Sequence, residues 1–137
     1  IQPQPATRVA YNGLPEDWDN MHEAMRRVVH GSGTATHPRY NMKGYAMAGK
    51  TGTAQVKGIK QNEKYDESKM DARHLDHAWF MGFAPVINPT IAVAVLVENG
   101  KHGGTTAGPI AKALFDYEVM GIVAPPPVSA DSEVVDE

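Results

Sequence analysis

Residues 90–98 contain seven consecutive apolar residues, IAVAVLV, directly after the turn dipeptide Asn88-Pro89. The length suits a strand. Both alternating sets of its side chains are apolar, so we expect a strand that is central in its sheet or covered on both faces. The preceding residues 77–85, HAWFMGFAP, are rich in aromatic side chains and predict a second strand. Because the connection between them is short, the two strands must pair antiparallel.

Helical patterns lie on both sides of this hairpin. Residues 15–30 place apolar side chains at three- and four-residue spacing, with Pro15 suited to the first turn and Gly31 to the end of a helix. Five apolar residues form the stripe expected to face the core: Trp18, Met21, Met25, Val28 and Val29. Residues 106–120 also have helical spacing, with Thr105 or Thr106 as the expected N-cap.

Two further segments complete the order of elements. Residues 45–56 predict a strand, and residues 57–76 are charged and poor in apolar side chains, which is typical of a long loop. The order is therefore helix, strand, long loop, strand, turn, strand, helix. It predicts an α+β fold in which helices pack on the faces of an antiparallel sheet.

Size and charge limit the classes of function. The chain has 137 residues, a net charge of -3 and no cysteine, so we expect one domain at most and neither a disulfide framework nor a nucleic-acid partner. No apolar run approaches the roughly 20 residues that span a bilayer. The N-terminus does not resemble a signal peptide, and we expect the chain to begin inside a longer or processed polypeptide.

The stretch GYAMAGKTGTAQV, residues 44–56, admits two interpretations. Gly44, Gly49, Lys50 and Thr51 fit G-x-x-x-x-G-K-[ST], the pattern of a phosphate-binding loop. Such a loop requires a buried strand before it and a helix that begins at the lysine. The residues that follow Lys50 include glycines and β-branched side chains and form a poor helix, which disfavours nucleotide binding.

As an exposed strand, the same residues suit the binding of a peptide that ends in a carboxylate. Lys50 supplies a cation, Thr51 a hydroxyl, and Thr53 a backbone N–H that can help hold an oxyanion. Gly49 and Gly52 leave the strand bare, so that a substrate backbone can approach and pair with it. The alternative is that Lys50 is an ordinary surface lysine.

The order of GSGTA, AGKTGTAQ, HAWFMGFAP, IAVAVLVENG and AGPIAKALFDY closely resembles class B penicillin-binding proteins, the serine D,D-transpeptidases that cross-link bacterial peptidoglycan. The resemblance is nearest to penicillin-binding protein 2, the elongation-type enzyme. It implies the penicillin-binding transpeptidase fold, which the serine β-lactamases share: a five-stranded antiparallel sheet between helices. Residues 1–120 would form the C-terminal portion of such a domain, and residues 121–137 a disordered, Pro-rich acidic tail.

Family sites combine S-x-x-K, S-x-N and K-T-G motifs. Only the third is present, as Lys50-Thr51-Gly52, so we expect the nucleophilic serine outside this sequence and no activity from this chain alone. By resemblance, Lys50 supplies positive charge and assists proton transfer. The Thr51 and Thr53 hydroxyls bind the carboxylate of a stem peptide or a β-lactam, and the Thr53 amide forms half of the oxyanion hole. Gly52 keeps the strand uncluttered. No metal or cofactor is needed.

The resemblance also implies partners and a location. The partners would be peptidoglycan stem peptides, β-lactams, the rest of the same polypeptide, and a cell-elongation complex with a glycosyltransferase. The location would be the periplasmic side of the inner membrane, with an anchor N-terminal to this sequence. Alternatives on the same fold are a β-lactamase, a D,D-carboxypeptidase, or a non-catalytic sensor or scaffold that binds β-lactams or peptides.

Three other features are weaker candidates. Asp71, His74, Asp76 and His77 suggest a metal cluster, but their segment lacks clean ligand spacing. Loop polarity explains Asp71 and His74, and His77 suits the start of a strand. The aromatic residues Trp79, Phe80 and Phe83 fit a core better than a cleft. The Gly-rich residues 99–106 are flexible enough to border the cleft.

Overall fold

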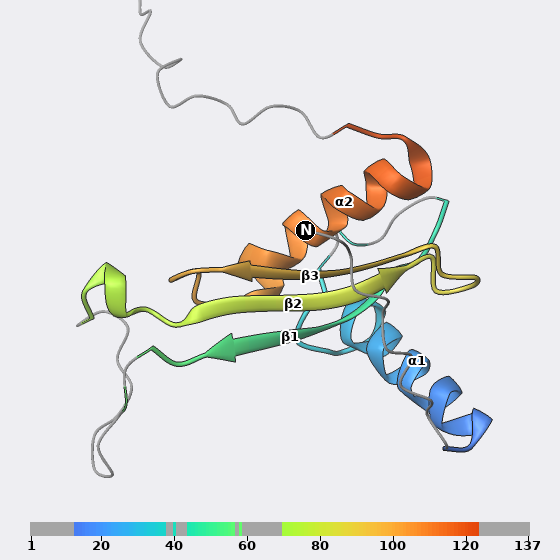
Figure 1. Cartoon of the computed structure of the whole chain (residues 1–137), viewed down its shortest axis with the longest axis horizontal. Helices are drawn as coiled ribbons and strands as arrows, with labels where there is room; N and C mark the ends of the chain where they lie inside the picture. Colours follow the sequence, from blue (N-terminus) through green and yellow to red (C-terminus); the bar gives the residue numbers. More distant parts are fainter. Residues whose placement is uncertain (1–12, 38–39, 41–43, 57, 59–69, 124–137) are drawn as a thin grey trace, which may run out of the picture.

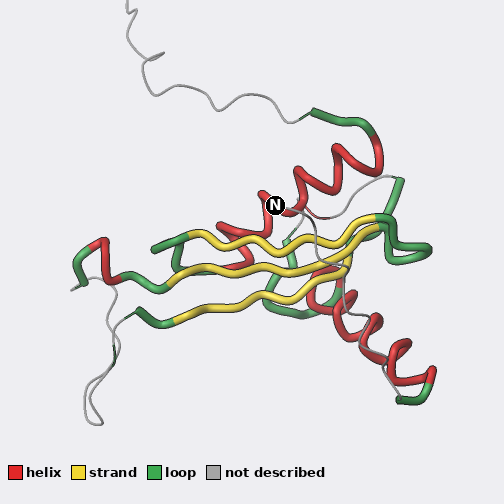
Figure 2. The backbone as a smooth tube through the Cα atoms, viewed as in Figure 1, coloured by secondary structure: helices red, strands yellow, loops and turns green. Residues whose placement is uncertain are grey.

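A computed structural model of the chain describes residues 13–37, 40, 44–56, 58 and 70–123. Its elements, in order, are α1 (Pro15–His30), β1 (Ala48–Ala54), the 3-10 helix η3 (Ala72–His74), β2 (His77–Ala84), β3 (Ile91–Val97), the π-helical turn η4 (Gly103–Ala107) and α2 (Gly108–Met120). The strands form one antiparallel sheet in the order β1-β2-β3, with the helices packed against it (Figures 1 and 2). The predicted α+β fold is confirmed.

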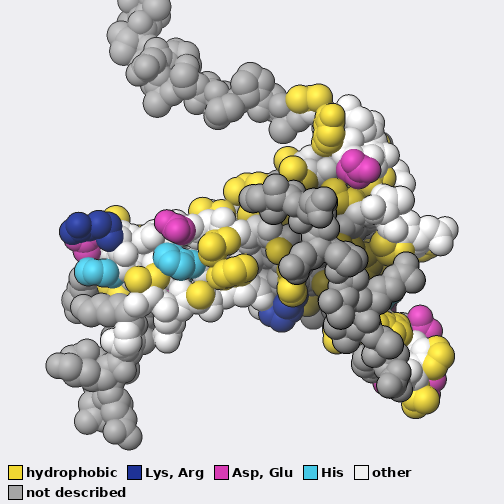
Figure 3. Space-filling view, viewed as in Figure 1, with side chains coloured by type: hydrophobic (Ala, Val, Ile, Leu, Met, Phe, Trp, Pro, Cys, Tyr) yellow, Lys and Arg dark blue, Asp and Glu magenta, His cyan; other side chains and the backbone are white. Residues whose placement is uncertain are grey.

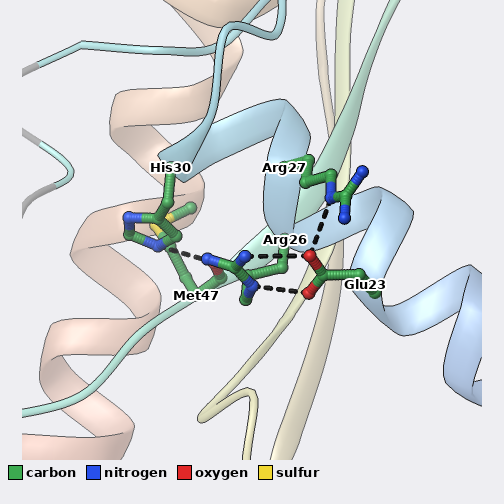
Figure 4. Close-up of polar contacts among 5 residues, drawn as sticks. All are labelled: Glu23, Arg26, Arg27, His30 and Met47. Carbon is green, nitrogen blue, oxygen red and sulfur yellow. Dashed lines mark hydrogen bonds and ion pairs between the residues drawn. The ribbon is translucent and has the colours of Figure 1, made fainter.

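Helix α1 has the predicted bounds, and the Gly31 amide closes it by donating to the Arg27 carbonyl at 2.9 Å. The Glu23 carboxylate accepts from both Arg26 and Arg27, and these hydrogen bonds lower its pKa to about 2 (Figure 4). At the helix end, His30 Nε2 lies 2.9 Å from the Met47 carbonyl oxygen. This contact ties α1 to the residue immediately before β1.

The apolar stripe of α1 is only partly buried. Val29 lies in the core, but Trp18 and Met21 are 51% and 55% exposed, so the expectation that they face the core was wrong. The physical reason is visible in Figure 1: α1 packs against the sheet where β1 begins, and its first turns extend past the described strands.

Strand β2 is the centre of the sheet, and its two faces differ. Phe80 is fully buried with Ala111 and Phe115 of α2, which lies alongside β2 and β3. On the opposite face, Trp79 and Met81 are exposed. Phe80 therefore belongs to the core as expected, whereas Trp79 does not.

Strand β3 departs from the prediction that both of its faces are covered. Its valines and Ile91 pack against the core, but Leu96 on the other face is 44% exposed. Within the described residues, β3 is an edge strand, and Ala92, Ala94 and Leu96 on that face are all exposed. Figure 3 shows hydrophobic side chains along the middle of the face in view, with charged groups at the left end, at the lower right and along the edges between them.

Two element boundaries also differ. β1 is shorter than residues 45–56, because its only pairing partner among the described residues is β2: Ala48 lies opposite Phe83, near the end of β2, and Ala54 lies opposite His77, where β2 begins. The predicted cap of α2 by Thr105 or Thr106 is wrong: η4 leads directly into α2, whose N-cap Ala107 makes no side-chain cap bond.

Within the described ranges, none of the helices has the length and apolarity needed to cross a bilayer. Most of residues 57–76 and 121–137 lie outside the described residues.

Candidate active-site strand

The four predicted site residues all lie on β1. β1 pairs with β2 along one edge, with Lys50 opposite Met81 and Thr53 opposite Ala78. Among the described residues, no strand pairs with the other edge of β1. An extended peptide could therefore pair with this edge of β1 as a further strand.

Lys50 and the two threonines lie on opposite faces of this strand. Successive side chains of a strand alternate, so Lys50 shares a face with Gly52, and Thr51 shares the other face with Thr53. Lys50 lies on the exposed face beside Met81, whereas Thr51 lies beside the buried Phe80. A ligand along the free edge would therefore have a cation on one side and hydroxyl groups on the other.

The Lys50 ammonium group is held locally. Its Nζ donates to the Thr51 carbonyl oxygen at 2.7 Å, and the side chain is exposed. No carboxylate forms an ion pair with it within the described part of the chain. The positive charge is therefore available to an anion.

The Thr51 hydroxyl has a partner that the sequence did not suggest. Thr51 Oγ1 lies 2.6 Å from Thr34 Oγ1, a residue of the loop that follows α1. The two residues are 17 positions apart, and nothing in the local pattern around Thr34 indicates that they meet. Thr53 is exposed further along the same face of β1.

The two glycines on either side of Lys50-Thr51 lie in different surroundings. Gly49 is buried, and a Cβ there would overlap the Phe80 ring and lie 2.8 Å from the Met81 carbonyl oxygen. Its function is close packing, so the interpretation that it leaves the strand open to substrate was wrong. Gly52 is less buried, and a Cβ would lie 3.2 Å from the Trp79 Cβ.

The turn η4 forms one wall beside β1. Gly103 packs against the strand backbone so closely that an added Cβ would overlap the Trp79 carbonyl oxygen and lie 2.9 Å from that of Gly52. A Cβ on Gly104 would lie 3.5 Å from the Thr51 Cγ2. Gly103 and Gly104 therefore border β1, whereas the expectation that residues 99–106 border a cleft stays a prediction. Contact between them and a ligand stays a prediction.

The phosphate-loop interpretation fails on backbone geometry. After Lys50 and Thr51 the chain continues as strand to Ala54, so no helix N-terminus is present at this position to bind phosphate.

Two of the four histidine and aspartate candidates near β2 have structural partners, whereas Asp76 is buried and its Oδ1 accepts no hydrogen bond from the described residues. Asp71 caps η3 and accepts from the Arg73 backbone and guanidinium, and these bonds lower its pKa. His77 begins β2 as expected, and its Nδ1 accepts from the Asn99 amide at 2.9 Å. Within the described ranges, no three His, Cys, Asp or Glu side chains gather in a group that could hold a metal ion.

The family model for the penicillin-binding protein transpeptidase domain matches residues 8–116. This chain belongs to that family. Its match with peptidoglycan D,D-transpeptidase MrdA of Acinetobacter baumannii has 48% identity over 120 residues, which is 88% of this chain and 17% of the relative. The match with MrdA of Escherichia coli K12 has 35% identity over 104 residues, 76% of this chain and 16% of the relative. The chain thus spans less than a fifth of these relatives.

Solved structures of the family agree with the fold. PBP2 of Pseudomonas aeruginosa, in complex with WCK 5153, matches with a TM-score of 0.63 and 39% identity over 88% of this chain and 23% of that one. PBP2 of Helicobacter pylori, in complex with MreC, matches with a TM-score of 0.59 and 29% identity. The match covers 78% of this chain and 18% of that one. Penicillin-binding protein A of Mycobacterium tuberculosis, as a penicillin G acyl-enzyme, matches with a TM-score of 0.50 and 32% identity. The match covers 77% of this chain and 21% of that one. The inferred class B, PBP2-type membership is confirmed.

Proposed function

We propose that this chain supplies the substrate-binding strand of a peptidoglycan D,D-transpeptidase. The observation that carries the proposal is the placement of Lys50 and the pair Thr51 and Thr53 on either side of the free edge of β1. A cation, two hydroxyls and an open strand edge suit an extended peptide that ends in a carboxylate. We assign residues 1–120 to the C-terminal portion of the transpeptidase domain and residues 121–137 to a tail.

The nucleophile of this reaction lies outside the sequence, since none of its four serines begins an S-x-x-K motif. That serine attacks the carbonyl carbon of the penultimate D-Ala of a stem pentapeptide. The C–N bond to the terminal D-Ala breaks, and D-Ala leaves after its nitrogen takes up a proton. An amine of a neighbouring stem then attacks the acyl ester, forms the new amide bond and releases the serine.

Three residues of β1 take part in these reaction steps, and a fourth, Gly52, shapes the strand. The Lys50 ammonium attracts the terminal carboxylate and assists proton transfer from its exposed face. The Thr51 and Thr53 hydroxyls donate to the same carboxylate from the opposite face of the strand edge. The Thr53 N–H stabilises the oxyanion of the tetrahedral intermediate together with the amide of the nucleophile. Gly52 keeps the strand narrow, so that the substrate backbone can approach.

The same site would bind β-lactams, which carry an equivalent carboxylate. The penicillin G acyl-enzyme of the M. tuberculosis relative supports this extension. We also propose that the whole polypeptide lies on the periplasmic side of the inner membrane, held by an N-terminal anchor. It would act there in a cell-elongation complex with a glycosyltransferase. The H. pylori relative was solved in complex with MreC, which supports a partner protein for the whole polypeptide.

Product analysis tests the proposed reaction. The whole polypeptide is incubated with a donor stem pentapeptide and a peptide that carries an acceptor amine, and the products are identified by mass. A cross-linked product with release of D-Ala supports a transpeptidase. Hydrolysed tetrapeptide alone would assign a carboxypeptidase, and the absence of both products would assign a non-catalytic binding domain.

A further inference from the structure

Thr34 lies outside the K-T-G motif, yet its hydroxyl oxygen is 2.6 Å from that of Thr51. The side chain of Thr34 is exposed, and Thr51 is only half-buried. The two hydroxyls therefore form one polar patch that solvent can reach, on the face of β1 that also carries Thr53.

The loop that carries Thr34 is held firmly in place. The Ala35 amide donates to the Val28 carbonyl at 3.1 Å, and the Thr36 hydroxyl donates to the Gly31 carbonyl at 2.6 Å. Ala35 is buried, and a Cβ on Gly33 would overlap the backbone of Val28. The position of the Thr34 hydroxyl is thus fixed by packing of the loop on α1, rather than by its contact with Thr51.

A third segment closes the patch. A Cβ on Gly104 of η4 would lie 2.7 Å from the Thr34 carbonyl oxygen and 3.5 Å from the Thr51 Cγ2. The Gly104 carbonyl in turn accepts from the Tyr40 hydroxyl at 2.5 Å. Three separate parts of the chain therefore converge on the two hydroxyls: the loop after α1, β1 and η4.

Hydroxyl chemistry suggests why they are paired. Each threonine hydroxyl has one proton and can rotate, so one donates to the other and leaves one proton pointing outward. When a carboxylate arrives, both hydroxyls can turn and donate to it, because a carboxylate accepts through both oxygens. We propose that Thr34 is a further carboxylate-binding residue, which acts beside Thr51 on the terminal carboxylate of the stem peptide and on that of a β-lactam. This inference rests on the proposed function of β1.

The test measures the second-order rate constant of acylation by a penicillin, using the whole polypeptide. Thr34→Val removes the hydroxyl and keeps the shape. We expect the rate constant to fall about 10- to 100-fold, the range for loss of a hydrogen bond to a charged group. Thr34→Ser, which restores the hydroxyl, should recover most of the rate. Thr90→Val is the matched control, because Thr90 is an exposed threonine on the β2–β3 turn.

Two further measurements separate direct contact from a structural role. With the methyl ester of the same penicillin, Thr34→Val and wild type should react equally, because the anionic group is gone. In a Thr51→Val background, Thr34→Val should still lower the rate. If Thr34→Val also reacts more slowly with the ester, the proposal is overturned in favour of a packing role. If Thr34→Val has no effect on the rate in the Thr51→Val background, it is overturned in favour of a positioning role.

The outcome for the wild type distinguishes this inference from the proposed function. If the wild-type polypeptide is never acylated, the proposed function fails and this inference fails with it. If the wild type is acylated and Thr34→Val reacts at the same rate, the inference alone is overturned. A thermal unfolding scan checks that each variant folds, and Thr34→Ala replaces Thr34→Val in every comparison if the valine variant does not fold.

Discussion

The Tyr45 hydroxyl donates to Asp116 Oδ1 at 2.6 Å, and so joins the segment that leads into β1 to the middle of α2. The other carboxylate oxygen of Asp116 pairs with Lys112, one turn earlier on the same helix. Burial, and then the contact with Asp116, raise the pKa of Tyr45, so the phenol stays a neutral donor. This contact fixes the backbone three residues before β1 begins.

Tyr45→Phe is expected to lower the free energy of unfolding of the transpeptidase domain by about 1 kcal/mol, since one hydrogen bond is lost and Asp116 keeps Lys112 as a partner. Denaturant unfolding of the whole polypeptide measures the change. Tyr117→Phe, at an exposed position of α2, is the matched control. Equal stability of the Tyr45 variant and wild type would show that the contact does not anchor β1.

Gly49→Ala should destabilise the domain by about 1–3 kcal/mol, the cost of overpacking a filled core. The added methyl group has no space between Phe80 and the Met81 carbonyl. The shift of β1 needed to accommodate it should also slow acylation by penicillin. Gly58→Ala is the control, because nothing lies within 4 Å of a Cβ at that position. A Gly49→Ala variant as stable as the Gly58→Ala variant would contradict this account of packing.

The lowered pKa of the Glu23 carboxylate predicts part of the loss of folding stability at acid pH. Its folded-state pKa is depressed from 4.5 to about 2 by hydrogen bonds from Arg26 and Arg27, so its stabilising effect is present above pH 4.5. The effect is lost as the pH falls from 4.5 toward 2. In Glu23→Gln, the thermal unfolding midpoint should therefore depend less on pH across this interval than in wild type. Glu16→Gln, in the first turn of α1, is the control, and identical profiles for wild type and Glu23→Gln would refute the assignment.

Local sequence patterns predicted the helices and strands better than they predicted what those elements pack against. The bounds of α1 follow from Pro15 and Gly31, and the pairing of β2 with β3 follows from the short turn that joins them. Tyr45 is a typical strand residue, but it lies before the start of β1, with its side chain in the core and its hydroxyl donating to Asp116. The expected cap of α2 failed because η4 turns into the helix directly, with close packing that its glycines permit.

The motif residues of the candidate site were predictable, but their spatial relationships were not. The K-T-G triad marks β1, whereas the contact between Thr34 and Thr51 joins residues 17 positions apart. Such a contact depends on how the loop after α1 packs, which no local periodicity encodes. The burial of Gly49 likewise depends on the Phe80 ring from the neighbouring strand.

The central claim is that β1 is the substrate-binding strand of a serine transpeptidase, and Lys50 tests it most directly. The measurement is the rate at which the whole polypeptide gains the mass of one penicillin, for wild type, Lys50→Ala and Arg73→Ala. Arg73 is the charge-matched control, since it lies exposed on η3 beside Asp71. We predict that wild type and Arg73→Ala are acylated at similar rates and that Lys50→Ala is slower by about 100-fold, as for loss of one group that stabilises the transition state. Equal rates for Lys50→Ala and wild type, or no acylation of the wild type, would contradict the account.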